Sequence, residues 1–146
     1  KKAGECVIKD DFQWVRDAMR DSDALMVATP IFFYTVSAHL KLFMDRCQSL
    51  WVKKYWIDQV LPEQRTPRKK GLLISVGATK GKRLFDGVVL TTKYFFDVFD
   101  AELWDSLLYR GLDLQGDVLK HPDYLEAAAA AGRRLAEAAG ISGESA

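Results

Sequence analysis

Residues 24–47 constrain the fold of this chain most strongly, because they combine a short apolar run, a loop and an amphipathic helix. The run at residues 24–29 has the length and composition of a buried strand. Pro30 ends the strand, since proline has no N–H to donate to a neighbouring strand. Ser37 is placed to cap a helix whose apolar residues recur at helical spacing as far as Leu50. The unit is therefore a strand, a loop and a helix.

The same alternation extends along the rest of the chain. The expected elements are a helix from Asp10 or Asp11 to residue 20, the strand at 24–29, the helix from Ser37, a buried strand at 71–76, a helix at 84–99, an edge strand at 101–109 and a last helix from Pro122. Residues 51–70 are expected to form an irregular basic and aromatic connection. Helices that alternate with strands predict an α/β fold, with a parallel sheet between layers of helices.

Composition favours one globular domain, and we treat residues 1–146 as that domain, with a frayed tail at residues 141–146. The net charge of +1 favours neither nucleic acid nor an anionic membrane as a partner. No apolar run approaches the roughly 20 residues that a membrane helix needs. Cys6 and Cys47 do not make a disulfide framework, so we expect a cytoplasmic location.

The loop at residues 29–36 is the first candidate site. Ligands of open α/β folds bind beyond the carboxyl ends of the strands, where this loop lies. Pro30 stiffens the loop, and Phe32, Phe33 and Tyr34 supply flat apolar walls. A flavin ring needs such a slot, because the cofactor carries the chemistry while the protein binds and orients it. The alternative is that these aromatic side chains belong to the core or to a subunit interface.

The turn at residues 75–83 is the second candidate site. Its glycines expose backbone amides after a strand, and Lys80, Lys82 and Arg83 add positive charge. This arrangement suits the N1–C2=O edge of a reduced flavin, or the phosphates of a pyridine nucleotide. The glycines match neither a Walker loop nor a GxGxxG turn, so a solvated basic turn is the alternative.

No set of residues indicates a metal site or a catalytic triad. His39 and His121 have no cysteine or histidine at ligand spacing, and Cys6 has only the distant Cys47. We therefore predict no metal ligands and no catalytic side chain.

Residues 29–32, 37–41 and 45–46 carry a resemblance to a known family. The run ATPIFFYTVSAHLKLFMDRC resembles the flavodoxin-like NAD(P)H-dependent FMN reductases, which include the iron-sulfur flavoproteins. The family pattern there is a strand, then Thr-Pro-x-Tyr/Phe, Ser-Ala-x-Leu-Lys and an Asp-Arg pair. The segments GECVIKDD and GLLISVGATKGKR also look like segments of that family.

The resemblance implies a flavodoxin-like three-layer sandwich that binds FMN. The residues that would line the flavin ring are Thr29, Pro30, Ile31, Phe32, Phe33 and Val36, and those that would close its other edge are Ser75, Gly77, Ala78 and Thr79. Lys80 would help to stabilise the reduced flavin, and Cys6 would correspond to the last cysteine of the iron-sulfur members' cluster motif.

Two departures from the family pattern qualify that expectation. The earlier cluster cysteines are absent, so no iron-sulfur cluster is assigned to this chain. The first strand and the Ser/Thr-rich loop that holds the FMN phosphate are also absent, which predicts weaker FMN binding and an N-terminally incomplete domain.

The function expected from these observations is an FMN-dependent oxidoreductase that passes electrons from NAD(P)H through flavin to a small acceptor. Two alternatives stay open: an electron-transfer module that meets protein partners, and a degenerate domain that serves oligomerisation. The helix at residues 84–99 is apolar on both sides, and residues 51–56 form an aromatic patch. These features predict a homo-oligomer, either a dimer or a tetramer.

Overall fold

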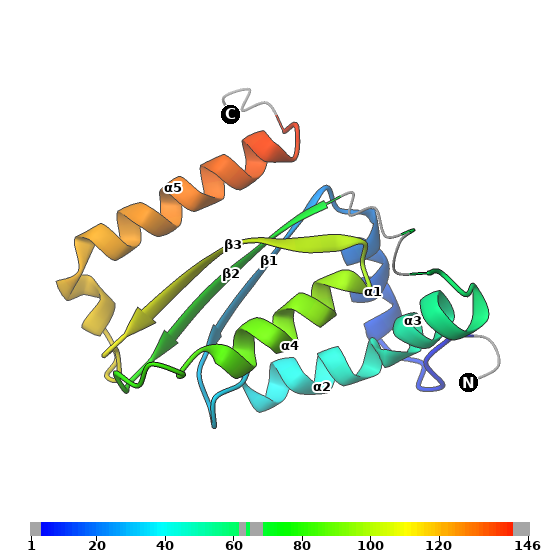
Figure 1. Ribbon diagram of the computed structural model, residues 1–146, viewed down its shortest axis with the longest axis horizontal. Coiled ribbons are helices and arrows are strands. Elements are labelled where there is room, and N and C mark those ends of the chain that lie inside the picture. Colours follow the sequence, from blue (N-terminus) through cyan, green and yellow to red (C-terminus); the bar gives the residue numbers. More distant parts are fainter. Residues whose placement is uncertain (1–3, 62–63, 65–68, 142–146) are drawn as a thin grey trace.

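A computed structural model describes residues 4–61, 64 and 69–141, whose helices and strands alternate as predicted (Figure 1). The strands are β1 (Ala24–Pro30), β2 (Lys69–Gly77) and β3 (Ala101–Arg110). They form a parallel sheet in the order β1-β2-β3, which confirms the α/β class and the edge position of the last strand. Residues 142–146 of the expected tail lie outside the described part.

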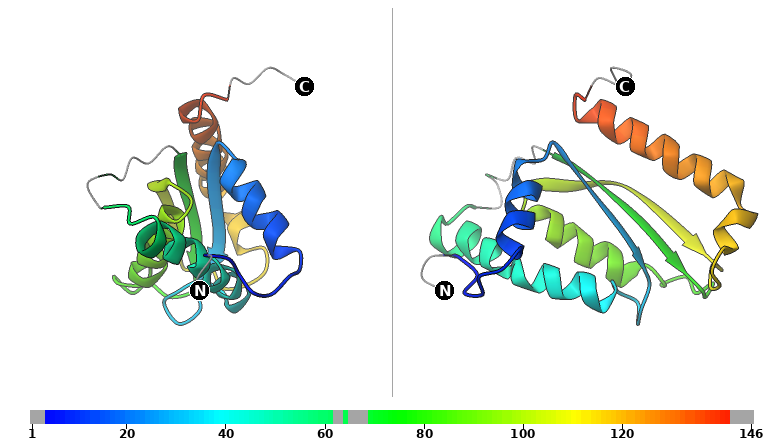
Figure 2. Two further views of the ribbon diagram at one scale, coloured as in Figure 1. Left: turned by 90° about the vertical axis from the view of Figure 1, so that its right-hand side faces the viewer. Right: turned by 180° about the vertical axis from the view of Figure 1, so that it is seen from behind.

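Helices cover both faces of the sheet. α2 (Ala38–Arg46) and α4 (Asp86–Asp97) lie on one face and α5 (Pro122–Ala138) lies on the other, which gives three layers (Figures 1 and 2). The other described helices are α1 (Phe12–Asp21), α3 (Gln48–Val52), the π-helix η1 (Lys53–Ile57) and the 3₁₀ helix η3 (Asp117–Lys120). All three strands end on the same side of the molecule, because they are parallel.

The main hydrophobic core lies between the sheet and the helices α2 and α4. Leu73 of β2 and Phe96 of α4 have no exposed surface in this core. On the other face, Ala131 and Leu135 of α5 pack around Leu72 and form a smaller cluster. Burial of this apolar area, at roughly 25 cal/mol per Å², is the main force that holds the layers together.

The beginning of the predicted irregular connection is helical instead. α3 and η1 together span residues 48–57. The ring of Trp51 lies 5.4 Å from that of Tyr55 and 5.8 Å from that of Trp56, so aromatic contacts across one turn support the helix. Residues 62–63 and 65–68 of the same connection lie outside the described part.

The apolar spacing of α1 predicts Phe12, Val15, Ala18 and Met19 as its inward face, and the structure differs at two positions. Ala18 is exposed, whereas Arg16 is only 7% exposed. The Arg16 guanidinium lies 2.5 Å from Glu5 and 2.9 Å from Asp17. Burial of a charge is costly unless it is paired, and these two carboxylates offset that cost.

Candidate functional site

The loop after β1 is a tight aromatic turn at the carboxyl edge of the sheet. Phe32 and Thr35 each donate a backbone hydrogen bond to the other, both at 3.0 Å. The two residues between them, Phe33 and Tyr34, have φ of 46° and 65°. This is the backbone of a type I′ turn, which Asn and Gly normally occupy, so the two aromatic residues hold it under strain. Strain of this kind clusters at binding sites.

Buried groups fasten the aromatic turn to the sheet. Ser75 Oγ donates to the carbonyl of Thr29 at 2.8 Å, and the Ser37 N–H donates to Thr29 Oγ1 at 3.2 Å. Ser37 accepts in turn from the N–H of Leu40 at 3.4 Å, which confirms the predicted helix cap. Val36 is 2% exposed. The side chains of Thr29, Val36 and Ser75 therefore support the loop from inside the protein.

The start of α4 holds the same turn from the other side. A Cβ atom placed on Gly87 would lie 2.2 Å from the carbonyl oxygen of Tyr34. Only glycine allows the helix and the turn to approach so closely.

The turn after β2 presents free backbone amides. Ala78, Thr79 and Lys80 are exposed, and within the described ranges their N–H groups donate to no protein acceptor. Arg110, at the end of β3, holds this turn in place: its Nε and Nη2 donate to the carbonyls of Gly81 and Lys82, each at 3.3 Å. The free amides are consequently available to an acceptor atom of a ligand.

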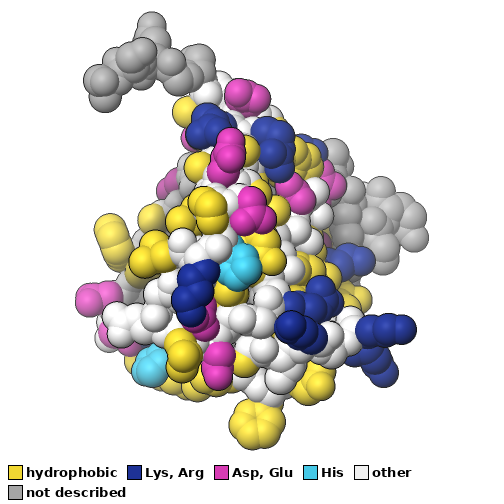
Figure 3. All heavy atoms as spheres, turned by 90° about the vertical axis from the view of Figure 1, so that its left-hand side faces the viewer, with side chains coloured by type: hydrophobic (Ala, Val, Ile, Leu, Met, Phe, Trp, Pro, Cys, Tyr) yellow, Lys and Arg dark blue, Asp and Glu magenta, His cyan; other side chains and the backbone are white. Residues whose placement is uncertain are grey.

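A cavity of about 440 Å³ lies between these two turns. The lining residues from the two predicted loops are Pro30, Ile31, Phe32, Val76, Gly77 and Ala78. Phe33, Thr79 and Lys80 are exposed next to these residues in the chain. Figure 3 shows this end of the molecule, where hydrophobic side chains lie beside a cluster of Lys and Arg. The structure thus brings the two predicted loops together, and the contact of each residue with a flavin stays a prediction.

The loop after β3, for which the sequence predicts no site, forms a third wall of the cavity. Residues 112–116 and Val118 line the cavity from this side. The N–H groups of Gly111 and Leu112 donate to the carbonyl of Gly77 at 2.8 and 3.3 Å, and so hold the loop against the end of β2. Gly111 and Gly116 are turn signals in the sequence of this loop, but its contact with the Gly77 carbonyl joins residues distant in the chain, and no local signal marks that contact.

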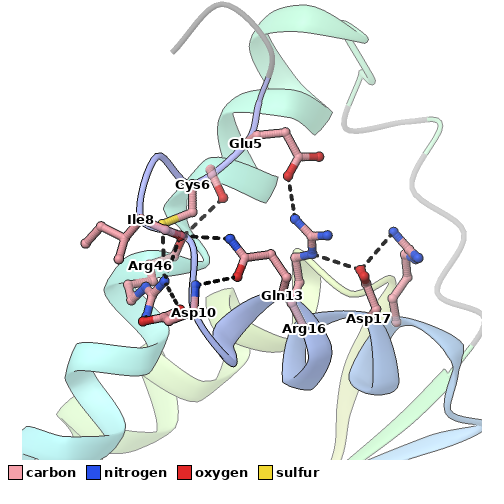
Figure 4. Close-up of polar contacts among 10 residues, drawn as sticks. Glu5, Cys6, Ile8, Asp10, Gln13, Arg16, Asp17 and Arg46 are labelled. Atoms are coloured by element: carbon pink, nitrogen blue, oxygen red, sulfur yellow. Dashed lines mark hydrogen bonds and ion pairs between the residues drawn. The ribbon is translucent and has the colours of Figure 1, made fainter.

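A separate polar cluster surrounds Cys6 (Figure 4). Arg46 of α2 donates to the two carboxylate oxygens of Asp10 at 2.8 and 2.7 Å, and its Nη2 lies 3.6 Å from Cys6 Sγ. Hydrogen bonds from the Ile8 amide and from Arg46 lower the pKa of the Cys6 thiol. Cys47, which is 1% exposed, differs sharply, because burial raises the pKa of its thiol to about 12.

Cys6 is therefore expected to react with iodoacetamide much faster than Cys47 at neutral pH. A lowered pKa increases the thiolate fraction, and the thiolate is the nucleophile. Mass spectrometry over a pH series measures both rates. In Arg46→Gln the rate profile of Cys6 should move to higher pH, whereas Arg20→Gln, which removes a charge elsewhere, should leave it unchanged. Equal reactivity of the two cysteines would contradict this account.

The described residues contain no group of three or more His, Cys, Asp or Glu side chains arranged to hold a metal ion. Within the same ranges, no helix combines the length and the apolar character required to span a membrane.

Comparison with known proteins identifies relatives. The family model described as NADPH-dependent FMN reductase matches residues 1–86. An iron-sulfur flavoprotein of Archaeoglobus fulgidus is 39% identical over 92 residues, which are 62% of this chain and 43% of that protein. An iron-sulfur flavoprotein of Methanocaldococcus jannaschii is 38% identical over 50 residues, or 34% of this chain and 26% of that protein. The matched part of the chain thus spans less than half the length of these relatives.

Two solved structures share the fold. The Trp repressor binding protein of Bacillus subtilis superposes with a TM-score of 0.61 at 24% identity, over 81% of this chain and 73% of that chain. A flavone reductase superposes with a TM-score of 0.58 at 19% identity, over 90% of this chain and 47% of that chain. These likenesses show the flavodoxin-like fold.

Proposed function

This chain belongs to the NADPH-dependent FMN reductase family, and we propose on that basis that its three-walled cavity holds the flavin ring of FMN. The observation that carries the proposal is an apolar cavity at the carboxyl ends of the strands, next to the free amides after β2. The proposed activity is the transfer of electrons from NAD(P)H through FMN to a small acceptor.

The residues that line the cavity fit a flavin ring. The ring is flat and largely apolar, and its polar pyrimidine edge needs hydrogen-bond donors. Pro30, Ile31 and Phe32 supply apolar surface. Gly77 allows Leu84 to pack closely against the end of β2, since a Cβ there would lie 2.8 Å from Leu84 Cδ2. The amides that follow Gly77 are donors without a protein acceptor in the described ranges.

When bound, FMN supplies the hydride and electron chemistry, and the protein supplies position and electrostatics. The strained turn around Phe33 and Tyr34 orients Phe32 at the cavity. The amide dipoles of residues 78–80 and the charge of Lys80 favour negative charge at the ring edge that they face. The chain would thus favour the reduced form of the flavin through these dipoles and this charge, without a catalytic acid or base.

A titration with FMN, followed by quenching of flavin fluorescence, tests this function. We expect saturable quenching by FMN, and by riboflavin, because the proposed contacts are with the ring. Oxidation of NADPH or NADH by the loaded protein, with free flavin or a quinone as acceptor, then tests turnover. A folded protein that quenches neither flavin would contradict the proposal.

The second candidate is an electron-transfer module that meets protein partners and has no turnover of its own. The names of the two relatives, both iron-sulfur flavoproteins, favour it. Steady oxidation of NAD(P)H without an added protein would exclude this candidate.

We also propose a homo-oligomer that forms through the groove between α2 and α4. The groove measures about 400 Å³ and includes Met44, Trp51 and Tyr94. Lys41 and Asp45 both lie along it, so a copy related by a two-fold axis would meet opposite charges. Sedimentation velocity over a range of concentrations measures the assembly, and a monomer throughout would contradict it.

The two free cysteines favour a reducing, cytoplasmic location for this protein.

A further inference from the structure

The carboxylate of Asp117 organises the loop after β3. Its Oδ2 accepts the N–H of Asp113 at 3.1 Å and the N–H of Leu114 at 2.7 Å. Its Oδ1 accepts from Lys120 Nζ at 2.7 Å. The side chain of Asp117 is 15% exposed and that of Lys120 is 73% exposed, so water screens the ion pair. The two backbone N–H groups are the contacts that fix the carboxylate to the loop.

The hydrogen bonds of Asp117 lie in the cavity wall itself. Asp113 and Leu114, which donate to the carboxylate, both line the cavity. At its start the loop is fixed to the Gly77 carbonyl, as described above, so β2 holds one end and Asp117 the other. The φ of 84° at Gly116 is a conformation that favours glycine and places the chain for this closure. Asp117 therefore holds this wall from behind, although its own side chain does not line the cavity.

We propose that Asp117 is a positioning residue of the flavin site, which shapes residues 111–118 into a wall that the ring packs against. The inference rests on the proposed function, because it assigns the ring to this cavity. An ordered wall keeps water from the ring, and water favours the charged reduced form. Asp117 thereby influences both the affinity for FMN and the midpoint potential of the bound flavin.

A structural role alone would have a different signature. Loss of η3 stability would lower the free energy of unfolding and leave the potential of bound flavin unchanged. Loss of the wall would weaken binding and shift the midpoint potential to more positive values, because water would replace apolar surface next to the ring.

Three variants of the full chain test the proposal, with Asp123→Ala as the matched control. Asp123 is an acidic residue in the first turn of α5 and does not line the cavity. Asp117→Ala should raise the Kd for FMN at least about tenfold and shift the potential. Asp117→Asn should have a smaller effect, because its amide oxygen still accepts the two N–H groups. Gln115→Trp changes an exposed wall residue and should block the cavity without affecting folding.

The outcomes separate the inference from the proposed function. A wild-type chain that binds neither FMN nor riboflavin would overturn both. A wild-type chain that binds FMN, with Asp117 variants that match Asp123→Ala in Kd and potential, would overturn the inference alone. If Asp117→Ala does not fold, Asp117→Asn gives the answer, and an FMN affinity and midpoint potential equal to those of Asp123→Ala would overturn the inference. Unchanged FMN affinity in Gln115→Trp would instead overturn the assignment of the ring to this cavity.

Discussion

Gly87→Ala is expected to destabilise the protein by about 1–3 kcal/mol and to weaken FMN binding about tenfold or more. The new methyl group would lie 2.2 Å from the carbonyl oxygen of Tyr34 and 3.2 Å from its carbon. Both are backbone atoms, so no side chain can rotate to relieve the clash. The turn that carries Phe32 must move away from α4, and the turn is already strained by positive φ at Phe33 and Tyr34. Stability and binding should therefore fall together.

Gly132→Ala in α5 is the matched control for this substitution. A Cβ on Gly132 meets no atom within 4 Å. Alanine in a helix is more favourable than glycine, so this variant should gain roughly 0.5–1 kcal/mol. Urea unfolding and FMN titration of both variants measure the contrast. A Gly87→Ala protein as stable as the Gly132→Ala protein would show that α4 does not constrain the turn.

The order of the elements could be predicted from sequence, because local signals mark them. The apolar runs of β1 and β2, the proline at the end of β1 and the cap at Ser37 all act within a few residues, and the structure places them as expected. The first two walls of the cavity were predictable for the same reason, since they directly follow those strands.

Features that depend on distant contacts were not predictable. Phe33 and Tyr34 gave no sign of a type I′ turn, because the sequence signal for that turn is Asn-Gly. The sequence alone indicates that Arg16 is a surface residue, because its ion pairs with Glu5 and Asp17 form only in the folded structure. In α5, the apolar spacing predicts an inward stripe that begins at Leu125, but Leu125 is 45% exposed whereas Ala131 is buried. The small Ala131 packs against the sheet, whereas the larger Leu125 does not. Hydrophobicity alone would predict the opposite.

Replacing Pro30 and Phe32 together with alanine is expected to abolish measurable FMN binding while the protein stays folded. Both residues line the cavity, and Phe32 is 58% exposed, so the core loses little when its ring is removed. The loss of an aromatic contact with the flavin ring lowers the binding free energy by about 0.5–1.5 kcal/mol. The apolar area that the phenyl ring no longer buries lowers it by about 1.5–3 kcal/mol more. The loss of the rigid proline increases the freedom of the unbound loop, which weakens binding further.

Thermal unfolding and FMN titration of the Pro30→Ala, Phe32→Ala double variant test this prediction. Trp14→Ala is the control, because it removes a ring that is 74% exposed on α1, outside the cavity. The control should bind FMN like the wild type, and both proteins should unfold near the wild-type temperature. If the folded double variant keeps wild-type affinity, the flavin does not contact the aromatic turn. The cavity between the three loops would then no longer be a candidate for the ring, since Phe32 is the aromatic residue among those that line it.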